Sequence, residues 1–507
     1  MPASITPMQS DLPWLVFVLP TAVGLFILLV GRFSRWLREG VALAGLAATF
    51  VVSAQVAAAV LHGHVLTAWG HTLYVDGLSA LMEILGSLMG AVIVVYSIRF
   101  ISHEVTGDPA STRRRYTTYY ALLLLFIGMM NWTCATNNVI MLWVSLEATT
   151  FATAFLVTFY WRRESLEAGY KYLLLVTVGV TFALFGCVLV YTAAVPLLGG
   201  RAGEALLLTS LGKVAGEIPK NIALLASAFF IAGFGTKAGL VPFHAWLPDA
   251  HAEAPAPVSA LLSGIVIKVG AYALARTITM FSGYSAVVVF VAILCSASML
   301  IGMGLAFVQD DLKRMLAYSS VAQIAYVVEG LGLGTYLGIY GGLFHLINHT
   351  LIKALLFLSA GAVMYATGTR KISELSGLAR TMPVTAFCFL VGALAIGGLP
   401  PLNGFWSKLT LFLALGDKGL LWAAVIGVVT AMMSVACFLM AAYKVFWGAY
   451  RAPAFAAANP HAKEVPASMW GGMVALALLC VSIGIYPRLV YPLLDSATRC
   501  ILSILGR

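Results

Sequence analysis

The chain has 507 residues, of which 61% are hydrophobic and only 10% are charged. This composition excludes a soluble globular protein, and the long continuous apolar runs exclude a transmembrane β-barrel, so an all-α polytopic membrane protein is expected. The net charge of +10 would suggest nucleic acid in a soluble domain, but the cations fall mostly between apolar segments and indicate membrane topology, with no nucleic-acid partner.

About 14 transmembrane helices are predicted, because a bilayer crossing takes roughly 20 apolar residues. In chain order, the predicted spans are 12–31, 41–61, 77–101, 117–135, 138–160, 169–196, 221–242, 257–280, 285–308, 315–333, 335–366, 383–415, 419–447 and 468–487. The 383–415 span is too long for one straight crossing, which indicates that this helix is interrupted.

Two of the predicted helices are broken. The first contains Lys237 and is followed by prolines at positions 242, 248, 255 and 257, each of which opposes a continuous helix. The second contains Gly-Gly-Leu-Pro-Pro-Leu-Asn-Gly at 397–404 and is followed by Lys408. Irregular backbone at membrane depth is tolerated where it lines an enclosed or hydrated cavity, so the two breaks predict an ion path.

The breaks lie about five spans apart, in helices of opposite orientation, which predicts two inverted five-helix repeats. The predicted organisation has four parts: N-terminal helices 1–3 over 1–116; a first repeat of helices 4–8 over 117–280, with its break near 242–257; a second, inverted repeat of helices 9–13 over 281–450, with its break near 397–404; and a loop with helix 14 over 451–507.

Alternate loops differ in charge, which predicts the topology. The cations concentrate in one set of loops, which holds Arg32, Arg35, Arg38, Arg113, Arg114, Arg115, Arg162, Arg163, Lys313, Arg314, Arg370, Lys371, Arg380, Arg451 and Lys463. The positive-inside rule then places both termini on the outer side of the inner (cytoplasmic) membrane.

The seven cysteines are scattered through apolar runs without a Cys-x-x-Cys pair. Zinc and iron–sulfur sites need clustered ligands, so the cysteines are interpreted as buried small hydrophobic residues. No metal, cofactor or redox centre is expected in this chain.

Three charged residues of the first half lie deep in apolar runs: Glu147, Lys237 and Lys268. An unpaired charge in hydrocarbon is costly, so Glu147 and Lys237 are expected to pair. Burial disfavours a charged lysine and a nearby carboxylate favours it, so movement of Glu147 would switch Lys237 between holding and releasing a proton. The alternative is a static structural ion pair. Lys171, near a helix end, is interpreted as reaching the membrane surface.

In the second half, His345, His349 and Lys353 are spaced by four residues and therefore share one helix face. Histidine relays protons near neutral pH, so the three predict a ladder of titratable groups that Lys408 would complete. The alternatives are a metal site, for which no third ligand is evident, or two hydrogen-bonded core histidines.

Other polar residues carry weaker signals. His244, Asp249, His251 and Glu253 lie beside the first break and either line an inlet or serve as caps and solvated loop residues. Asp76 is interpreted as a helix N-cap. The charged run Asp310, Asp311, Lys313 and Arg314 is interpreted as a solvated loop.

Several of these motifs resemble one family. The sequence Gly-Thr-Lys-Ala-Gly-Leu-Val-Pro-Phe-His-Ala-Trp-Leu-Pro-Asp-Ala-His at 235–251 resembles the signature of the complex I and Mrp antiporter-like subunits, as does His-Leu-Ile-Asn-His-Thr-Leu-Ile-Lys at 345–353. Trp-Val-Ser-Leu-Glu-Ala-Thr-Thr at 143–150 resembles the hydrogenase-4 component F branch most.

The resemblance implies a fourteen-helix fold with a proton path along a central polar axis. By matching motif, Glu147 and Lys237 would be the ion pair and Lys268 the connecting lysine. His345, His349 and Lys353 would form the central relay, and Lys408 would be the terminal lysine.

Three functions are compatible with these observations. The first is a proton-translocating subunit of a hydrogenase-4, formate hydrogenlyase or complex I-like complex, with redox chemistry in its partners. The second is a non-redox transporter of protons or sodium ions, either a Mrp-type antiporter subunit or the membrane partner of an inorganic-carbon uptake complex. The expected partners are other membrane subunits and a soluble redox or zinc-containing protein. An inert scaffold is disfavoured, because nothing would then offset the insertion cost of the buried charges.

Overall fold

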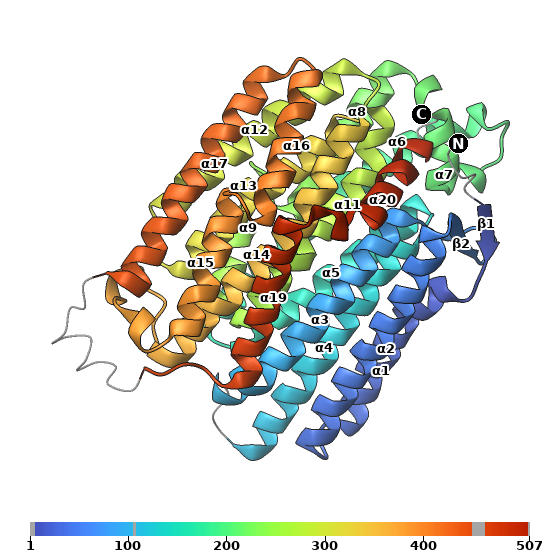
Figure 1. Ribbon diagram of the computed structural model, residues 1–507. Coiled ribbons are helices and arrows are strands. Elements are labelled where there is room, and N and C mark those ends of the chain that lie inside the picture. Colours follow the sequence, from blue (N-terminus) through green and yellow to red (C-terminus); the bar gives the residue numbers. More distant parts are fainter. Residues whose placement is uncertain (1–5, 105–107, 449–461, 505–507) are drawn as a thin grey trace.

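The computed structural model describes residues 6–104, 108–448 and 462–504, and most of them belong to a bundle of long helices (Figure 1). The helices are α1 (Leu12–Val30), α2 (Arg35–Leu61), α3 (Gly77–Glu104), α4 (Pro109–Ala135), α5 (Val139–Val157), α6 (Arg163–Leu197), α7 (Leu208–Val214), α8 (Lys220–Ala238), α9 (Trp246–Glu253), α10 (Ala256–Leu261), α11 (Ile267–Thr277), α12 (Ser285–Phe307), α13 (Leu312–Gly332), α14 (Tyr336–Thr367), α15 (Pro383–Gly397), α16 (Asn403–Asp417), α17 (Leu421–Ala442), α19 (Ala467–Ile485) and α20 (Tyr491–Ile504).

The chain is a multi-pass integral membrane protein. Among the residues that the structure describes, 12 helices are long and apolar enough to cross a bilayer. Helix α13 falls outside this group because polar residues such as Ser319, Gln323 and Glu329 lower its hydropathy, and α15 and α16 because each has only 15 residues. Large apolar side chains such as Phe185, Leu421 and Met432 are exposed on the outer helices, as expected for surfaces that face lipid.

The first interruption begins earlier than the prolines alone predict. Helix α8 ends at Ala238 because Gly239 adopts a left-handed conformation with φ of 80°. The short helix α9 then forms inside the predicted break. Pro248 does not end it, because this residue lies in its first turn, where a missing N–H is tolerated. Helical structure continues in α10 at Ala256.

The second interruption lies within the residues where the sequence places it. Helix α15 ends at Gly397, and Gly398 adopts a φ of 85°. Helix α16 then begins at Asn403. A third irregularity is not evident from the sequence: Leu262–Val266, between α10 and α11, is π-helical.

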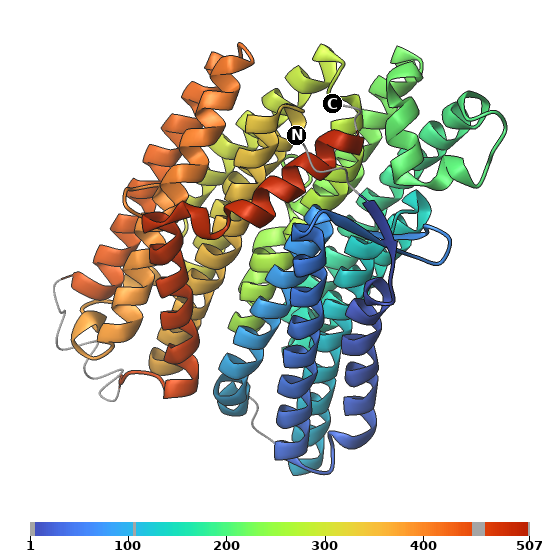
Figure 2. The same cartoon turned by 45° about the vertical axis from the view of Figure 1, so that its right-hand side comes forward.

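A three-stranded sheet of β1 (Thr6–Gln9), β2 (His64–Ala68) and β3 (Leu73–Val75) was not expected from the sequence. Strand β1 pairs in parallel with β2 so that Thr6 faces His64, and β2 pairs antiparallel with β3 so that Leu66 faces Val75. The sheet lies at the same end of the bundle as both termini, and α20 runs obliquely across the bundle there (Figures 1 and 2).

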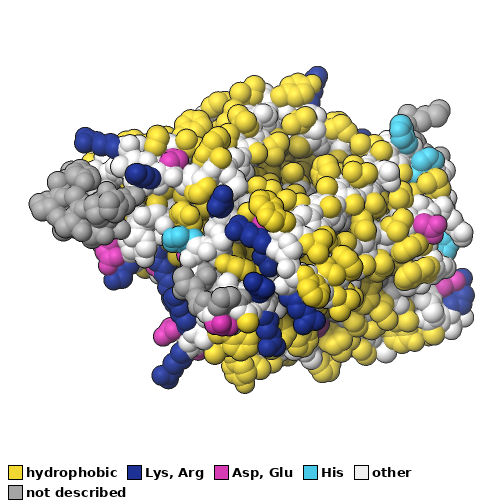
Figure 3. Space-filling view, turned by 90° about the horizontal axis from the view of Figure 1, so that it is seen from below, with side chains coloured by type: hydrophobic (Ala, Val, Ile, Leu, Met, Phe, Trp, Pro, Cys, Tyr) yellow, Lys and Arg dark blue, Asp and Glu magenta, His cyan; other side chains and the backbone are white. Residues whose placement is uncertain are grey.

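The opposite end of the bundle carries a dense group of lysine and arginine side chains (Figure 3). Of the cations assigned to this side from the sequence, Arg451 lies outside the described residues.

Helices α11 and α14 form the centre of the bundle. Every residue of α11 is buried, and α14 packs against α10, α13, α15, α16 and α19. Lys268 on α11 and His345, His349 and Lys353 on α14 are therefore enclosed by protein rather than by lipid.

Candidate functional site

Lys237 is fully buried in the last turn of α8, immediately before the first interruption. Its Nζ donates hydrogen bonds to Thr150 Oγ1 on α5 at 2.7 Å and to Tyr172 OH on α6 at 3.2 Å. Two neutral hydroxyl groups therefore hold this amine.

The direct Glu147–Lys237 pair expected from the sequence is not formed: no salt bridge within 4.0 Å joins them in the described part of the chain. Glu147 accepts a hydrogen bond from Thr177 Oγ1 at 3.2 Å through Oε2, whereas its Oε1 has no hydrogen-bond partner there. Thr150 lies three residues after Glu147, on the same face of α5. The Lys237 ligand Thr150 therefore lies close to the carboxylate.

Lys268 and Lys353 are linked through Ser263, Ser320 and the backbone oxygen of Leu316, which accepts from both Ser320 Oγ and Lys353 Nζ. The amine of Lys268 donates to the backbone oxygen of Ser263, which belongs to the π-helical turn. The hydroxyl groups of Ser263 and Ser320 are 2.8 Å apart, and Lys353 donates to Ser319 Oγ and to Leu316 O. A π-helical turn disturbs the regular i to i−4 hydrogen bonding. This explains why a backbone oxygen within a helix is available to Lys268.

His345 and His349 lie on α14 with parallel rings, whose centroids are 6.1 Å apart. His345 Nδ1 lies 3.0 Å from Ser407 Oγ on α16. The other ring nitrogen of His345 and both nitrogens of His349 have no hydrogen-bond partner among the described residues. Among the described residues, the alternative of two hydrogen-bonded core histidines is therefore supported only by the contact of His345 with Ser407.

Lys408 lies at the second interruption. Its Nζ donates to Ile396 O at 2.7 Å and approaches Gly397 O at 3.4 Å. These are carbonyl groups of the last turn of α15, which lack helical partners and carry the negative end of the helix dipole. The interrupted helix thus provides polar ligands for a buried amine.

Close packing at the second interruption leads to a testable prediction. A Cβ atom on Gly404 would lie 1.9 Å from Ala395 O, so Gly404→Ala is expected to push α16 away from α15 and displace Lys408. The expected loss of stability is about 1–3 kcal/mol, measured by thermal unfolding in detergent. Gly416→Ala in the same helix is the control, because no atom lies within 4 Å of its Cβ position. Equal stability of the two variants would contradict this packing.

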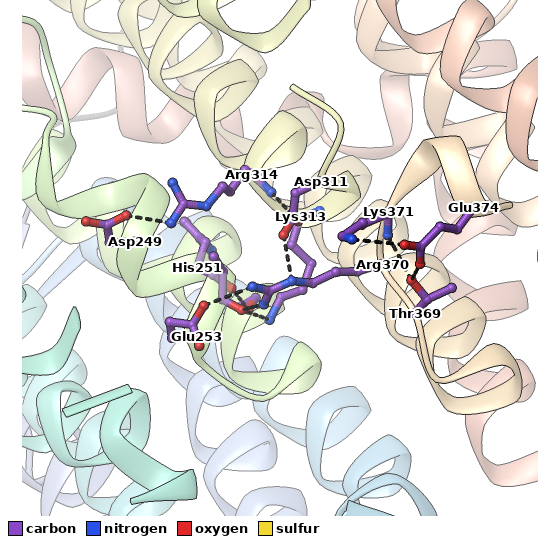
Figure 4. A network of polar contacts seen from close by, with 12 residues as sticks. Asp249, His251, Glu253, Asp311, Lys313, Arg314, Thr369, Arg370, Lys371 and Glu374 are labelled. Carbon is purple, nitrogen blue, oxygen red and sulfur yellow. Dashed lines mark hydrogen bonds and ion pairs between the residues drawn. The ribbon is translucent and has the colours of Figure 1, made fainter. Parts of the chain in front are cut away.

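Of the four residues beside the first break, Asp249 and Glu253 belong to an ion-pair network (Figure 4), whereas the two histidines form no ion pair among the described residues. Asp249 pairs with Arg314 at 3.0 Å and Lys171 at 3.4 Å, and Glu253 pairs with Arg370 at 2.9 Å. His251 is buried and stacks on Phe357, with neither ring nitrogen hydrogen-bonded to described residues, whereas His244 is partly buried.

The solvated loop assigned to residues 310–314 is wrong in part. Lys313 is only 1% exposed and donates to Ala252 O and Ala254 O, and the Asp311 carboxylate pairs with Arg370. A cavity of about 500 Å³ beside the network is lined by Arg162, Asp310 and Lys371, among other residues. This face is therefore a structured polar site beside the broken helix.

Two features were missed from the sequence. Asp76 caps α3 as expected, accepting from Leu78 N and Ser79 N, but it also forms a buried ion pair with Arg276 on α11. Glu83 on α3 is fully buried, and neither carboxylate oxygen has a hydrogen-bond partner among the described residues. The sequence offered one signal for the ion pair of Arg276. Lys268, Tyr272 and Arg276 are spaced by four residues, which places Arg276 on the same helix face as the buried Lys268.

The described residues contain no group of three or more His, Cys, Asp or Glu side chains arranged to hold a metal ion.

Comparison with known proteins places the chain in a family. Residues 136–434 match the family described as NADH:quinone oxidoreductase/Mrp antiporter, transmembrane. The matched residues include Glu147, Lys237, Lys268, His345, His349, Lys353 and Lys408. The chain belongs to this family of complex I and Mrp antiporter-like membrane subunits.

Two proteins of related sequence and one solved structure are similar to this chain over most of its length. A hydrogenase-4 component F homolog from Methylacidiphilum infernorum is 36% identical over 72% of this chain and 77% of its own length. The NADH-quinone oxidoreductase subunit N of Desulforudis audaxviator is 32% identical over 94% and 96% of the two chains. A chain of the membrane-bound sulfane sulfur reductase, an archaeal respiratory membrane complex, superposes with a TM-score of 0.86 at 25% identity, covering 98% of this chain and 99% of the other.

Proposed function

We propose that this chain is a proton-translocating membrane subunit of a hydrogenase-4, formate hydrogenlyase or complex I-like complex. The observation that carries the proposal is the row of buried titratable groups Glu147, Lys237, Lys268, Lys353, His349, His345 and Lys408, held by hydroxyl and carbonyl groups between the two helix interruptions. A static scaffold gives no reason for so many buried amines without acidic partners.

In the proposed mechanism, the position of Glu147 controls Lys237. When the carboxylate approaches, it stabilises the ammonium form of Lys237, and the lysine holds a proton. When it withdraws, only Thr150 and Tyr172 remain as ligands, burial favours the neutral amine, and the proton moves on. Lys268, Lys353 and the two histidines then pass it towards Lys408.

The proposed repeats, residues 117–280 and 281–450, correspond to α4 to α11 and to α12 to α17, although α4 itself begins earlier, at Pro109. In each unit the fourth membrane-crossing helix is the interrupted one: α8 in the first and the α15–α16 pair in the second. Counting α13 and α15–α16 with the helices that qualify by length and composition gives about 14 crossings. An even number of crossings is consistent with both termini lying at one end of the bundle (Figure 1).

We place the termini on the outer side of the cytoplasmic membrane. The lysine- and arginine-rich end of the bundle is opposite the termini (Figure 3), and cytoplasmic loops are the ones that carry an excess of these residues.

The partner subunits distinguish the proposed function from its alternative, a non-redox transporter such as a Mrp-type antiporter subunit or the membrane partner of an inorganic-carbon uptake complex. The family itself includes Mrp antiporters, which favours keeping this second candidate. Gentle detergent purification followed by mass spectrometry separates the two. Co-purifying nickel–iron and iron–sulfur subunits are expected; a single soluble zinc protein or a set of small Mrp-like subunits would contradict the redox assignment.

A further inference from the structure

Glu83 is a buried acid outside the row described above. It lies on α3, is 0% exposed, and has no hydrogen-bond partner for either carboxylate oxygen among the described residues. A charged carboxylate in such surroundings is strongly disfavoured, whereas a carboxyl group that holds a proton is tolerated. The row of buried groups from Glu147 to Lys408 does not include Glu83, so it does not explain why an unpaired acid is buried here.

Helix α11 connects the row with the neighbourhood of Glu83. Lys268, Tyr272 and Arg276 follow one another at four-residue spacing and therefore lie along one face of the helix. The hydroxyl of Tyr272 lies 3.3 Å from Ser79 Oγ on α3. Ser79 in turn is one helical turn from Glu83 on the same face. Tyr272 and Ser79 thus each lie one helical turn along their own helix from a buried titratable group, Lys268 and Glu83 respectively.

The two hydroxyl groups share one acceptor. Tyr272 OH donates to Cys134 O at 2.7 Å, and Ser79 Oγ donates to the same oxygen at 2.6 Å. Because each hydroxyl has a single hydrogen, one must leave this carbonyl oxygen before it can donate to the other. The arrangement allows a proton to pass between them by rotation of the two O–H groups.

Arg276 does not serve as the counterion of Glu83. Its guanidinium makes two short bonds to Asp76, at 2.6 and 2.7 Å, and also donates to Tyr272 OH and to Ser79 Oγ at 3.0 Å each, so its donors are taken up by this cluster. The other titratable groups that face this region are Cys134 from α4, Tyr272 from α11 and, beside Asp76, Cys500 from α20. Within the described residues, no free cation therefore neutralises Glu83.

We propose that Glu83 is a second proton-binding site, which exchanges a proton with Lys268 through the hydroxyl groups of Tyr272 and Ser79. In the transfer, the Lys268 ammonium gives a proton to the Tyr272 oxygen, Tyr272 gives its own to Ser79, and Ser79 gives its own to the Glu83 carboxylate. Lys268 and Glu83 both end neutral, and both hydroxyl groups are restored. In the structure the Lys268 amine donates to Ser263 O and Ser79 Oγ donates to Cys134 O. The first and last steps therefore each require a side chain to turn along its helix, over the roughly 5–6 Å that separate Cβ atoms one turn apart, or one bridging water.

The two hydroxyl groups of this branch lie near the end of the bundle that holds the termini, and α3 runs from there back towards the centre, where Glu83 lies. Asp76 and Arg276 lie near the end with the termini, and α20 covers the first turn of α3: a Cβ atom on Gly77 would lie 2.6 Å from Ala497 N. The inference rests on the proposed proton translocation and adds a side path from the centre of the row.

The test uses the intact complex purified from native membranes and two measurements. Infrared difference spectroscopy at neutral pH detects the carbonyl stretch of a protonated carboxyl group, and a pH-sensitive dye in proteoliposomes detects translocation. Glu83→Gln is expected to remove a protonated-carboxyl band and to slow translocation on the order of 10- to 100-fold. Glu83→Asp, which keeps the acid, is expected to restore part of the rate and to retain a carboxyl band.

Tyr272→Phe tests the connection, with Tyr119→Phe as the matched control. Both tyrosines are buried and contact a serine of α3, but the partner of Tyr119 is Ser97, away from the branch, at 2.8 Å. Tyr272→Phe is expected to slow translocation and Tyr119→Phe to leave it unchanged.

Either an unchanged carboxyl band or a wild-type rate in Glu83→Gln overturns the proposal, and so do equal rates in the two tyrosine variants. If Lys237→Ala abolishes translocation while Glu83→Gln does not alter it, the branch is wrong and the proposed function stands. If neither variant alters translocation, both are wrong.

Discussion

Replacing Lys237 by alanine is expected to reduce ion translocation by the assembled complex by about 100-fold or more. Thr150 and Tyr172 hold the amine of this lysine at the first helix interruption, and no other amine among the described residues binds these two hydroxyl groups. Its removal therefore breaks the row between Glu147 and Lys268. Dye-detected acidification of inverted membrane vesicles measures the effect, with the amount of assembled complex determined by native electrophoresis.

Two further lysine variants sharpen this test. Lys220→Ala is the matched control, because Lys220 is the exposed first residue of α8, the helix that carries Lys237 in its last turn; it is expected to translocate normally. Lys237→Arg is expected to assemble and to retain only part of the activity, because arginine keeps a positive charge but does not readily release a proton. Normal translocation by assembled Lys237→Ala would show that the row is not the path.

The second large effect concerns stability. Asp76→Ala leaves the buried Arg276 guanidinium without its carboxylate, and breaking a buried ion pair by removing one partner costs about 3–5 kcal/mol. The variant also loses the cap of α3, made through Leu78 N and Ser79 N, which adds about 1 kcal/mol. A large fall in thermal stability in detergent, or failure to assemble, is expected.

Arg499→Ala provides the comparison for this prediction. Arg499 also pairs with an aspartate, Asp495, but its side chain is 57% exposed. An exposed pair contributes at most about 1 kcal/mol, so little change is expected. The double variant Asp76→Ala/Arg276→Met is expected to be less destabilised than the sum of its single variants, because no charge is left unpaired. Additive losses would show that the two side chains are not energetically coupled.

The sequence predicted the features that depend on local chemistry. Prolines 242 and 400 oppose helix continuation wherever they occur, so both interruptions were visible without a structure. The face shared by His345, His349 and Lys353 follows from helical periodicity alone. Long apolar runs likewise identified most of the membrane-crossing helices.

Features that depend on distant contacts were not predictable from one sequence. Asp76 and Arg276 are 200 residues apart in the chain, and only the packing of α3 near α11 brings them together. Lys313 looked like a solvated loop residue, because nothing local shows that the carbonyl groups of Ala252 and Ala254 would enclose its amine. The expected Glu147–Lys237 contact was wrong in detail for the same reason: Thr150 and Tyr172 compete for the amine as ligands.

The central claim is that this chain moves protons across the membrane along its buried row. The most direct test reconstitutes the purified complex in sealed liposomes that contain a pH-sensitive dye and starts the reaction of its partner subunits. A pH change that a protonophore abolishes, and that is absent with Lys237→Ala in a complex whose partners still react, is the predicted result. Full partner activity without any proton movement in the wild-type complex would contradict the claim.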